Sequence, residues 1–175
     1  MIISVFGGSR ADDATNAVAY ELGRRIAIHG HTLKNGGNAG TMEASSKGCV
    51  EHGGKVIGAL FKSTTVPGLM AHNPYSTETR VFDSYLDRVK FLLEADRVIA
   101  LPGQIGTLDE ILAAWVDAVV NDKPPVLLVG QKNKELLDFL FAKNYVKQDE
   151  HARYVLPVAS LDEIEFLPAC GPSLP

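Results

Sequence analysis

The sequence predicts a single α/β domain, a doubly wound Rossmann-like parallel sheet with helices on both faces, and three observations support this fold class. Short apolar runs typical of buried strands alternate with longer segments of helical periodicity. The strand-like runs are apolar almost without interruption, as in Val126-Leu127-Leu128-Val129, which is typical of parallel strands covered on both sides. The 175 residues, 46% of them apolar, suffice for one substantial core.

The first third of the chain predicts three strands separated by two helices. Residues 2–6 form an apolar β-type run that stops at glycines, and Asp12 or Asp13 can cap the helix that follows. The predicted strands are residues 2–6, 31–34 and 55–61, and the predicted helices run from Asp12 or Asp13 to about Gly30 and from about Thr41 to His52.

Residues 62–79 show no periodicity and contain two prolines and a glycine, so we interpret them as a loop. A loop of this length in a compact domain is more often functional than idle. We expect the domain to span residues 1–167, followed by a loose tail at 168–175. The other predicted elements are a helix at about 80–95, a strand at 97–101, a helix whose first turn carries Thr107 and Glu110 and that ends by Pro124, a strand at 125–130, a helix at 134–143, a strand at 155–158 and a short helix from Ser160.

Composition and charge argue against several classes of protein. The net charge of −4 and the pI near 5.7 disfavour binding to nucleic acid or to an anionic membrane. No apolar run approaches the roughly 20 residues of a membrane span, and the N-terminus lacks the basic region of a signal peptide, so we expect a cytoplasmic protein. Cys49, Cys170 and the five histidines show no metal-binding spacing, and we expect Cys49 to be a buried free thiol. Neither a metal nor a cofactor is expected.

Two stretches of the chain share one pattern. Residues 37–43 and 103–109 both contain Gly-x-x-Gly-Thr followed by an apolar and an acidic residue, each between a predicted strand and a predicted helix. Gly7-Gly8-Ser9 follows the first strand. In a sheet of order 3-2-1-4-5, counted over the predicted strands, all three turns lie at the carboxyl edge.

Unpaired N–H groups at a helix start attract anions, and glycine lets a phosphate approach the backbone closely. The three turns therefore predict a phosphate site at which two helix starts converge. The expected phosphate- or nucleotide-binding residues are Gly8, Ser9, Gly36, Gly37, Gly40, Thr41, Pro102, Gly103, Gly106 and Thr107.

A purely structural interpretation competes for two residues of this corner. Thr107-x-x-Glu110 also fits a capping box, in which the Glu carboxylate returns to the backbone N–H of the cap residue. Ser160-x-x-Glu163 fits the same pattern at a place without an expected function. Capping does not account for the Pro-Gly turn before Thr107 or for the matching turn at 37–41. No Gly-x-Gly-x-x-Gly follows the first strand, which disfavours ordinary dinucleotide binding.

The two stretches resemble motifs of the LOG (LONELY GUY) family, long labelled lysine decarboxylase-like, and the resemblance covers about residues 2–145. The family pairs a Gly-Gly turn before a Met-bearing helix with a Pro-Gly-Gly-x-Gly-Thr-x-x-Glu motif. The first corresponds to Gly36-Gly37-Asn38-Ala39-Gly40-Thr41-Met42 and the second to Pro102-Gly103-Gln104-Ile105-Gly106-Thr107-Leu108-Asp109-Glu110.

The resemblance implies a homodimeric phosphoribohydrolase that cleaves the N-glycosidic bond of a nucleoside 5′-monophosphate. Such cleavage passes through an oxocarbenium-like state, so a carboxylate beside the ribose can stabilise positive charge, a role that falls to Glu110. The apolar helix around Trp115 is also consistent with a dimer, although helical spacing equally fits a core position for Trp115. Residues 62–80 are expected to set the base preference.

Two departures from the family pattern leave an alternative open. Gln104 stands where the family has the second Gly of Pro-Gly-Gly, and the family's adjacent Arg-Lys pair is replaced by Asp87-Arg88-Val89-Lys90. Arg88 is our candidate for the functional arginine, and Arg80 is a weaker one. The alternative function is a non-catalytic nucleotide- or molybdenum-cofactor-binding carrier of the same fold.

Overall fold

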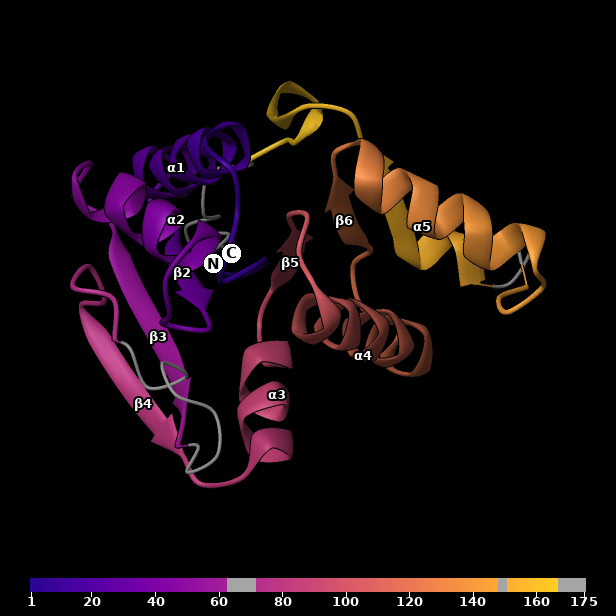
Figure 1. Cartoon of the computed structure of the whole chain (residues 1–175), viewed down its shortest axis with the longest axis horizontal. Coiled ribbons are helices and arrows are strands. Elements are labelled where there is room, and N and C mark those ends of the chain that lie inside the picture. Colours follow the sequence, from indigo (N-terminus) through magenta and orange to yellow (C-terminus); the bar gives the residue numbers. More distant parts are fainter. Residues whose placement is uncertain (63–71, 148–150, 167–175) are drawn as a thin grey trace, which may run out of the picture.

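Parallel strands form one sheet through the middle of the molecule (Figure 1). The computed structural model describes residues 1–62, 72–147 and 151–166. Within these residues the sheet has seven strands in the order β4-β3-β2-β1-β5-β6-β7. The strands are β1 (Ile2–Phe6), β2 (Thr32–Asn35), β3 (Lys55–Phe61), β4 (Glu78–Phe82), β5 (Arg97–Ala100), β6 (Val126–Val129) and β7 (Val155–Val158).

Helices cover both faces of this sheet, which confirms the predicted fold class. Figure 1 shows α1 and α2 together on one side, and α3 and α4 on the other. Two apolar cores result, one between the sheet and α1 with α2, the other between the sheet and α3, α4 and α5. The helices are α1 (Asp13–Ile28), α2 (Thr41–Val50), α3 (Tyr85–Leu93), α4 (Ile105–Asn121) and α5 (Gln131–Ala142), with 3₁₀ turns η1 (Ala152–Tyr154) and η2 (Leu161–Glu163).

The predicted strand order holds for the five central strands. β5 and β6 are the fourth and fifth strands expected from the sequence, and β1 lies between β2 and β5. The order of winding therefore reverses between β1 and β5, where α/β sheets bind ligands beyond the carboxyl ends of the strands. An edge strand is added on each side, β4 against β3 and β7 against β6.

The predicted helix at about 80–95 is wrong in its first part. Residues 78–82 form the edge strand β4, and α3 begins only at Tyr85 after Ser84, whose hydroxyl accepts a hydrogen bond from the Asp87 N–H at 3.3 Å. Val81 fits the helical period of the following residues, so the pattern alone predicts the longer helix. Pairing with β3 satisfies the backbone of this segment instead, and the side chains of an edge strand need no apolar pattern because many face solvent.

Several other expectations concern single residues or termini. Cys49 is a buried free thiol as predicted, and burial raises its pKa to about 11. Trp115 lies in the core, and its indole N–H donates to the His151 carbonyl at 3.0 Å. The predicted tail at 168–175 and half of the predicted loop at 62–79 lie outside the described residues, and the last two residues of that loop belong to β4. Across the described ranges, none of the helices combines the length and apolar character that a membrane crossing requires.

Candidate functional site

The three glycine turns predicted from the sequence meet at the carboxyl edge of the sheet, between β1, β2 and β5. Gly8 lies at the centre of this corner. Its carbonyl accepts hydrogen bonds from the backbone N–H and the hydroxyl of Thr41, at 3.0 Å and 3.1 Å. A Cβ on Gly8 would lie 3.3 Å from the Cα of Gly103, and a Cβ on Gly40 would overlap the Gly8 carbonyl. We call this corner, formed by residues 7–9, 36–41 and 102–107, the glycine corner.

Two helices start at the glycine corner without a side-chain cap. In the part of the chain that the structure describes, no side chain caps α2, which starts after Gly40, or α4, which starts after Gln104. By contrast, Asp12 caps α1 and Ser84 caps α3. Apart from the Thr41 N–H, which donates to the Gly8 carbonyl, backbone N–H groups at the starts of α2 and α4 therefore remain available to an external acceptor, and both helix dipoles place positive charge there.

Gly106 is the position at which the chain leaves room for a ligand. A Cβ on this glycine would meet no protein atom within 4 Å, and its backbone does not have a positive φ. Among the described glycines it is the only one with both properties. Thus neither protein packing nor backbone conformation requires a glycine in the first turn of α4. Close approach of an anion to the backbone at this position would explain it.

A buried ion pair closes the inner side of the glycine corner. The guanidinium of Arg88 from α3 contacts the carboxylate of Glu110 from α4 at 3.0 Å, and the two residues are 6% and 7% exposed. Arg88 Nε also donates to the Ala59 carbonyl at 2.7 Å. A Cβ on Gly36 would overlap the guanidinium, so Arg88 reaches from α3 to the turn before α2. The arginine thereby connects both halves of the corner.

Opposing effects act on the carboxyl group of Glu110. Burial raises its pKa above the ordinary value, and the charge and hydrogen bond of Arg88 act in the opposite direction. A carboxylate held in a dry environment beside a single cation is a common arrangement in active sites. It interacts with a nearby developing positive charge more strongly than a solvated carboxylate does.

The capping-box interpretation of Thr107 and Glu110 is wrong. α4 begins at Ile105 after the N-cap Gln104, so Thr107 is the third residue of the helix rather than its cap. The Thr107 side chain is buried, and its hydroxyl occupies the space that a Cβ on Gly103 would need. Glu110 lies in the second turn and pairs with Arg88 instead of returning to the helix start. Where α4 begins depends on the length of the turn after β5, which the local pattern does not reveal.

The structure also separates the two arginine candidates. Arg88 lies on α3, and its guanidinium reaches the inner side of the glycine corner beside Gly36. Arg80 lies on the edge strand β4, pairs with Glu78 at 3.0 Å and has its guanidinium 4.8 Å from the centre of the Phe91 ring. Its side chain is 55% exposed. Of the two candidates, only Arg88 has its guanidinium beside the turns of the glycine corner.

The remaining predicted residues also lie at the glycine corner. Ser9 is exposed at its rim, and Pro102 packs against the helix start at Gly130, which would place a Cβ 3.6 Å from the proline ring. Gly37 adopts a φ of +71°, a conformation that favours glycine. The structure therefore brings together all twelve residues that the sequence motifs single out.

Buried asparagines that carry no recognisable motif hold the turns in place. Asn35 accepts a hydrogen bond from the Gly37 N–H at 2.9 Å and donates to the Met42 carbonyl at 2.9 Å. The Asn73 N–H donates to the Gly37 carbonyl at 2.9 Å. Asn133 donates to the Ala100 carbonyl, directly before the second turn, at 2.9 Å. Single asparagines have no sequence period, so only the position of Asn35 directly before Gly36-Gly37 could have indicated a role.

A second pair lies beside Arg88 and Glu110. The hydroxyl of Tyr85 in the first turn of α3 donates to Asp109 of α4 at 2.7 Å. Burial, with that hydrogen bond, raises the pKa of Tyr85. Asp109 belongs to the second glycine motif, but no pattern in the sequence indicates Tyr85 as its partner.

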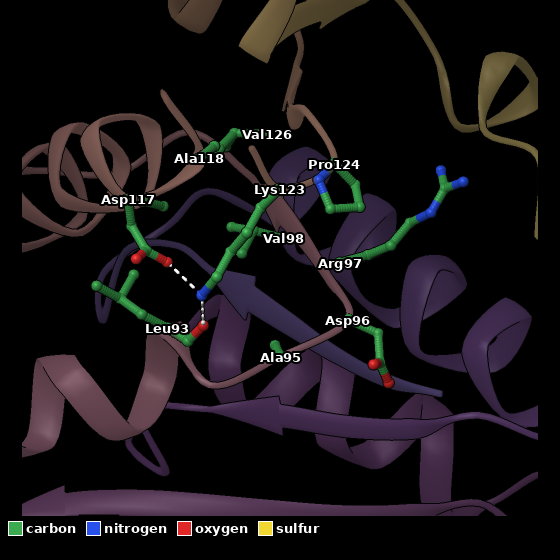
Figure 2. A pocket seen from close by; sticks show the side chains of 11 residues that line it. Leu93, Ala95, Asp96, Arg97, Val98, Asp117, Ala118, Lys123, Pro124 and Val126 are labelled. Carbon is green, nitrogen blue, oxygen red and sulfur yellow. Dashed lines mark hydrogen bonds and ion pairs between the residues drawn. The ribbon is translucent and has the colours of Figure 1, made fainter. Parts of the chain in front are cut away.

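A shallow pocket on the opposite edge of the sheet is a different feature. It lies where β5 and β6 begin and α4 ends, and Figure 2 shows Lys123 crossing it toward Asp117 and the Leu93 carbonyl. Lys123 contacts these groups at 2.5 Å and 3.4 Å, so its charge is already compensated. Within residues 1–62, 72–147 and 151–166 there is no group of three or more His, Cys, Asp or Glu side chains that could hold a metal ion. The glycine corner is the better candidate for the functional site.

Comparisons with known proteins identify the family. A model described as the SLOG cluster4 family matches residues 1–156. A Mycobacterium tuberculosis protein named cytokinin riboside 5′-monophosphate phosphoribohydrolase is 31% identical over 165 residues, which cover 89% of this chain and 85% of the relative. An uncharacterized protein of Archaeoglobus fulgidus is 34% identical over 134 residues, which cover 75% of this chain and 86% of the relative.

A solved structure shares the fold of this chain. The molybdenum cofactor binding protein of Rippkaea orientalis superimposes with a TM-score of 0.70 at 30% identity, covering 91% of this chain and 89% of that one. The glycine corner and the Arg88–Glu110 pair lie within the segment that the family model matches. The chain is therefore a member of the SLOG cluster4 family, a LOG-type group, as the two glycine motifs of its sequence predicted.

Proposed function

We propose that this protein is a phosphoribohydrolase that cleaves the N-glycosidic bond of a nucleoside 5′-monophosphate, giving the free base and ribose 5-phosphate. The observation that carries the proposal is the buried Arg88–Glu110 pair directly beside two uncapped helix starts. Backbone N–H groups suited to a phosphate and a carboxylate suited to the ribose thus lie side by side.

The glycine corner binds the 5′-phosphate in this proposal. Backbone N–H groups of α2 and α4 donate to phosphate oxygens, and the open space at Gly106 lets the phosphate lie against the first turn of α4. Thr41 and Thr107 fix the turns around it through contacts with Gly8 and Gly103. Binding at this point orients the ribose before the reaction begins.

Glu110 acts on the ribose. As the bond from C1′ to the base nitrogen breaks, positive charge develops on C1′ and the ring oxygen, and the Glu110 carboxylate stabilises it. Water adds to C1′ and loses a proton, while the departing base gains one, so the products are ribose 5-phosphate and the free base. Arg88 holds the carboxylate charged and in place through the 3.0 Å contact.

Product analysis tests the proposal directly. Purified protein is incubated with AMP, GMP and cytokinin riboside monophosphates, and free base is measured by chromatography. We expect base release from at least one substrate, and Glu110→Gln should lower the rate by about a hundredfold, the usual weight of a positioned catalytic group. Glu78→Gln, which alters the exposed pair with Arg80, is the matched control and should leave the rate unchanged. The absence of base release from all these substrates would refute the proposal.

A carrier function is the second candidate. It is favoured by the similarity to the Rippkaea orientalis protein, whose title names molybdenum cofactor binding, and by Gln104 in place of the family glycine. A carrier would use the glycine corner to hold the phosphate of a pterin cofactor without cleaving a bond. Tight binding of such a cofactor, with no release of base from any nucleotide, would favour this function over the hydrolase.

We also propose that two copies of the chain associate through α4. Leu112, Val116 and Val120 recur every four residues along this helix, and the last two are 62% and 73% exposed. Such a stripe of exposed apolar side chains is unusual on a monomer surface. A second copy is the expected occupant, because the same stripe on each chain can pack around a two-fold axis.

A further inference from the structure

The first turn of α5 is attached to the glycine corner from the outside. Asn133 is buried and donates to the carbonyls of Ala100 at 2.9 Å and Val129 at 3.1 Å, which connects α5 to the end of β5. The N-cap Gly130, with a φ of +88°, packs against Pro102. These contacts fix the start of α5 beside the turn at residues 102–103.

Lys132 extends from this fixed position to the turn itself. Its ammonium group donates to the carbonyl of Gly103 at 3.0 Å, at an exposed position. The other polar side chains around it have partners one turn further along α5: Gln131 contacts Glu135 and Lys134 contacts Asp138. The residue one turn after Lys132 is Leu136, and no carboxylate within the described ranges forms an ion pair with Lys132.

The proposed ligand needs a cation that the inner part of the glycine corner does not supply. A phosphate monoester carries nearly two negative charges at neutral pH. Arg88 is buried, and its charge is compensated by Glu110 at 3.0 Å. Helix starts contribute only partial charges, about half an elementary charge each. A lysine at the edge of the phosphate-binding turn, bound only to a carbonyl, supplies the missing charge.

We propose that Lys132 is a phosphate-binding residue of the glycine corner. Its ammonium group leaves the Gly103 carbonyl when the ligand binds and contacts a phosphate oxygen, a change that the flexible four-carbon stem permits. This inference rests on the proposed function only in that the ligand carries a terminal phosphate. It assigns to α5 a part of the site that neither glycine motif includes.

Calorimetric titration with ribose 5-phosphate and with inorganic phosphate tests the inference. Lys132→Ala should weaken ribose 5-phosphate binding about tenfold or more, as the loss of a hydrogen bond to a charged group does. Lys134→Ala removes a lysine from the same turn of the same helix and should bind like the wild type. The melting temperatures of both variants serve to confirm that the fold is intact.

Two further variants distinguish charge from structure. Lys132→Gln keeps a donor for the Gly103 carbonyl but loses the charge, so it should bind as weakly as Lys132→Ala, whereas Lys132→Arg should recover most of the affinity. Full affinity in Lys132→Gln would mean that Lys132 only supports the turn, and would overturn the inference. A loss of affinity in Arg10→Ala, with Lys132→Ala unchanged, would overturn it as well, because Arg10 follows Ser9 at the rim.

The outcomes separate this inference from the proposed function. Lysine-dependent binding of ribose 5-phosphate without base release from any nucleotide supports the inference and counts against the hydrolase. Base release that is equally fast and equally saturable in Lys132→Ala overturns the inference and leaves the hydrolase intact. If the wild type binds neither ribose 5-phosphate nor inorganic phosphate, the inference is also overturned.

Discussion

Replacing Arg88 by Met should show how strongly the buried pair contributes to stability. The substitution removes a guanidinium, keeps a side chain of similar length and leaves Glu110 in an environment where it is 7% exposed. Breaking a buried ion pair by removing one partner costs about 3–5 kcal/mol of unfolding free energy. The Ala59 carbonyl loses its donor as well. We expect a cost in this range at pH 8, measured by urea denaturation.

The cost should depend on pH in a defined direction. In Arg88→Met, no cation opposes the effect of burial on Glu110. The pKa of Glu110 in the folded protein therefore lies further above the ordinary 4.5 than it does in the wild type. The unfolded carboxyl releases its proton near pH 4.5, whereas the folded one retains it to higher pH. Between these two pKa values the unfolded state binds fewer protons, so the unfolding free energy falls as pH rises, by up to about 1.4 kcal/mol per unit.

Controls make the result specific to the buried pair. Arg80→Met breaks a pair of the same 3.0 Å length whose side chains are 55% and 51% exposed, and should cost less than about 1 kcal/mol at every pH. The double variant Arg88→Met/Glu110→Gln lacks the titrating group and should lose the additional slope. An equal cost for Arg88→Met and Arg80→Met between pH 5 and 8, or a slope that survives in the double variant, would refute the reasoning.

Three further predictions concern the corner and the surface. Gly106→Ala should raise the unfolding free energy by about 0.5 kcal/mol, because alanine suits a helix better, yet weaken phosphate binding at least about tenfold by filling the open space; a variant that binds phosphate normally would contradict the proposed site. Asn35→Ala should cost about 2 kcal/mol of unfolding free energy in urea denaturation, because the buried Gly37 N–H loses its acceptor; a cost below about 1 kcal/mol would contradict this. Val116→Asp should convert a dimer into monomers in sedimentation equilibrium, and a wild-type monomer would refute the association through α4.

The glycine corner could be predicted from the sequence because its pattern is local and occurs twice. Repeated glycines between a strand and a helix are typical of turns at which a ligand approaches the backbone. Parallel topology then brings turns that are far apart in sequence to the same edge. The Arg88–Glu110 contact could be proposed only through the family resemblance. Its burial and geometry depend on how α3 packs against α4, which no short pattern reveals.

Other features could not be predicted because the information is not local. The sequence pattern divides β4 between the predicted loop at 62–79 and the predicted helix at about 80–95, because its pairing with β3 is a tertiary effect. A capping box would put the N-cap of α4 at Thr107 instead of Gln104, since threonine is the better cap by residue type. Lys132 and Asn133 act from a helix about 30 residues beyond the turn that they contact, and one lysine or one asparagine on a helix predicts nothing by itself.

The two halves of the glycine corner belong to different layers of the protein. α2 packs in the apolar core on one face of the sheet, and α4 packs in the core on the other. The chain around Gly8 and the guanidinium of Arg88 connect them at the site. A phosphate bound at both helix starts therefore couples the stabilities of the two layers, because it is released as soon as either one opens. Saturating ligand should slow amide hydrogen exchange in α2 and α4 by the same factor, although the two helices lie in separate cores.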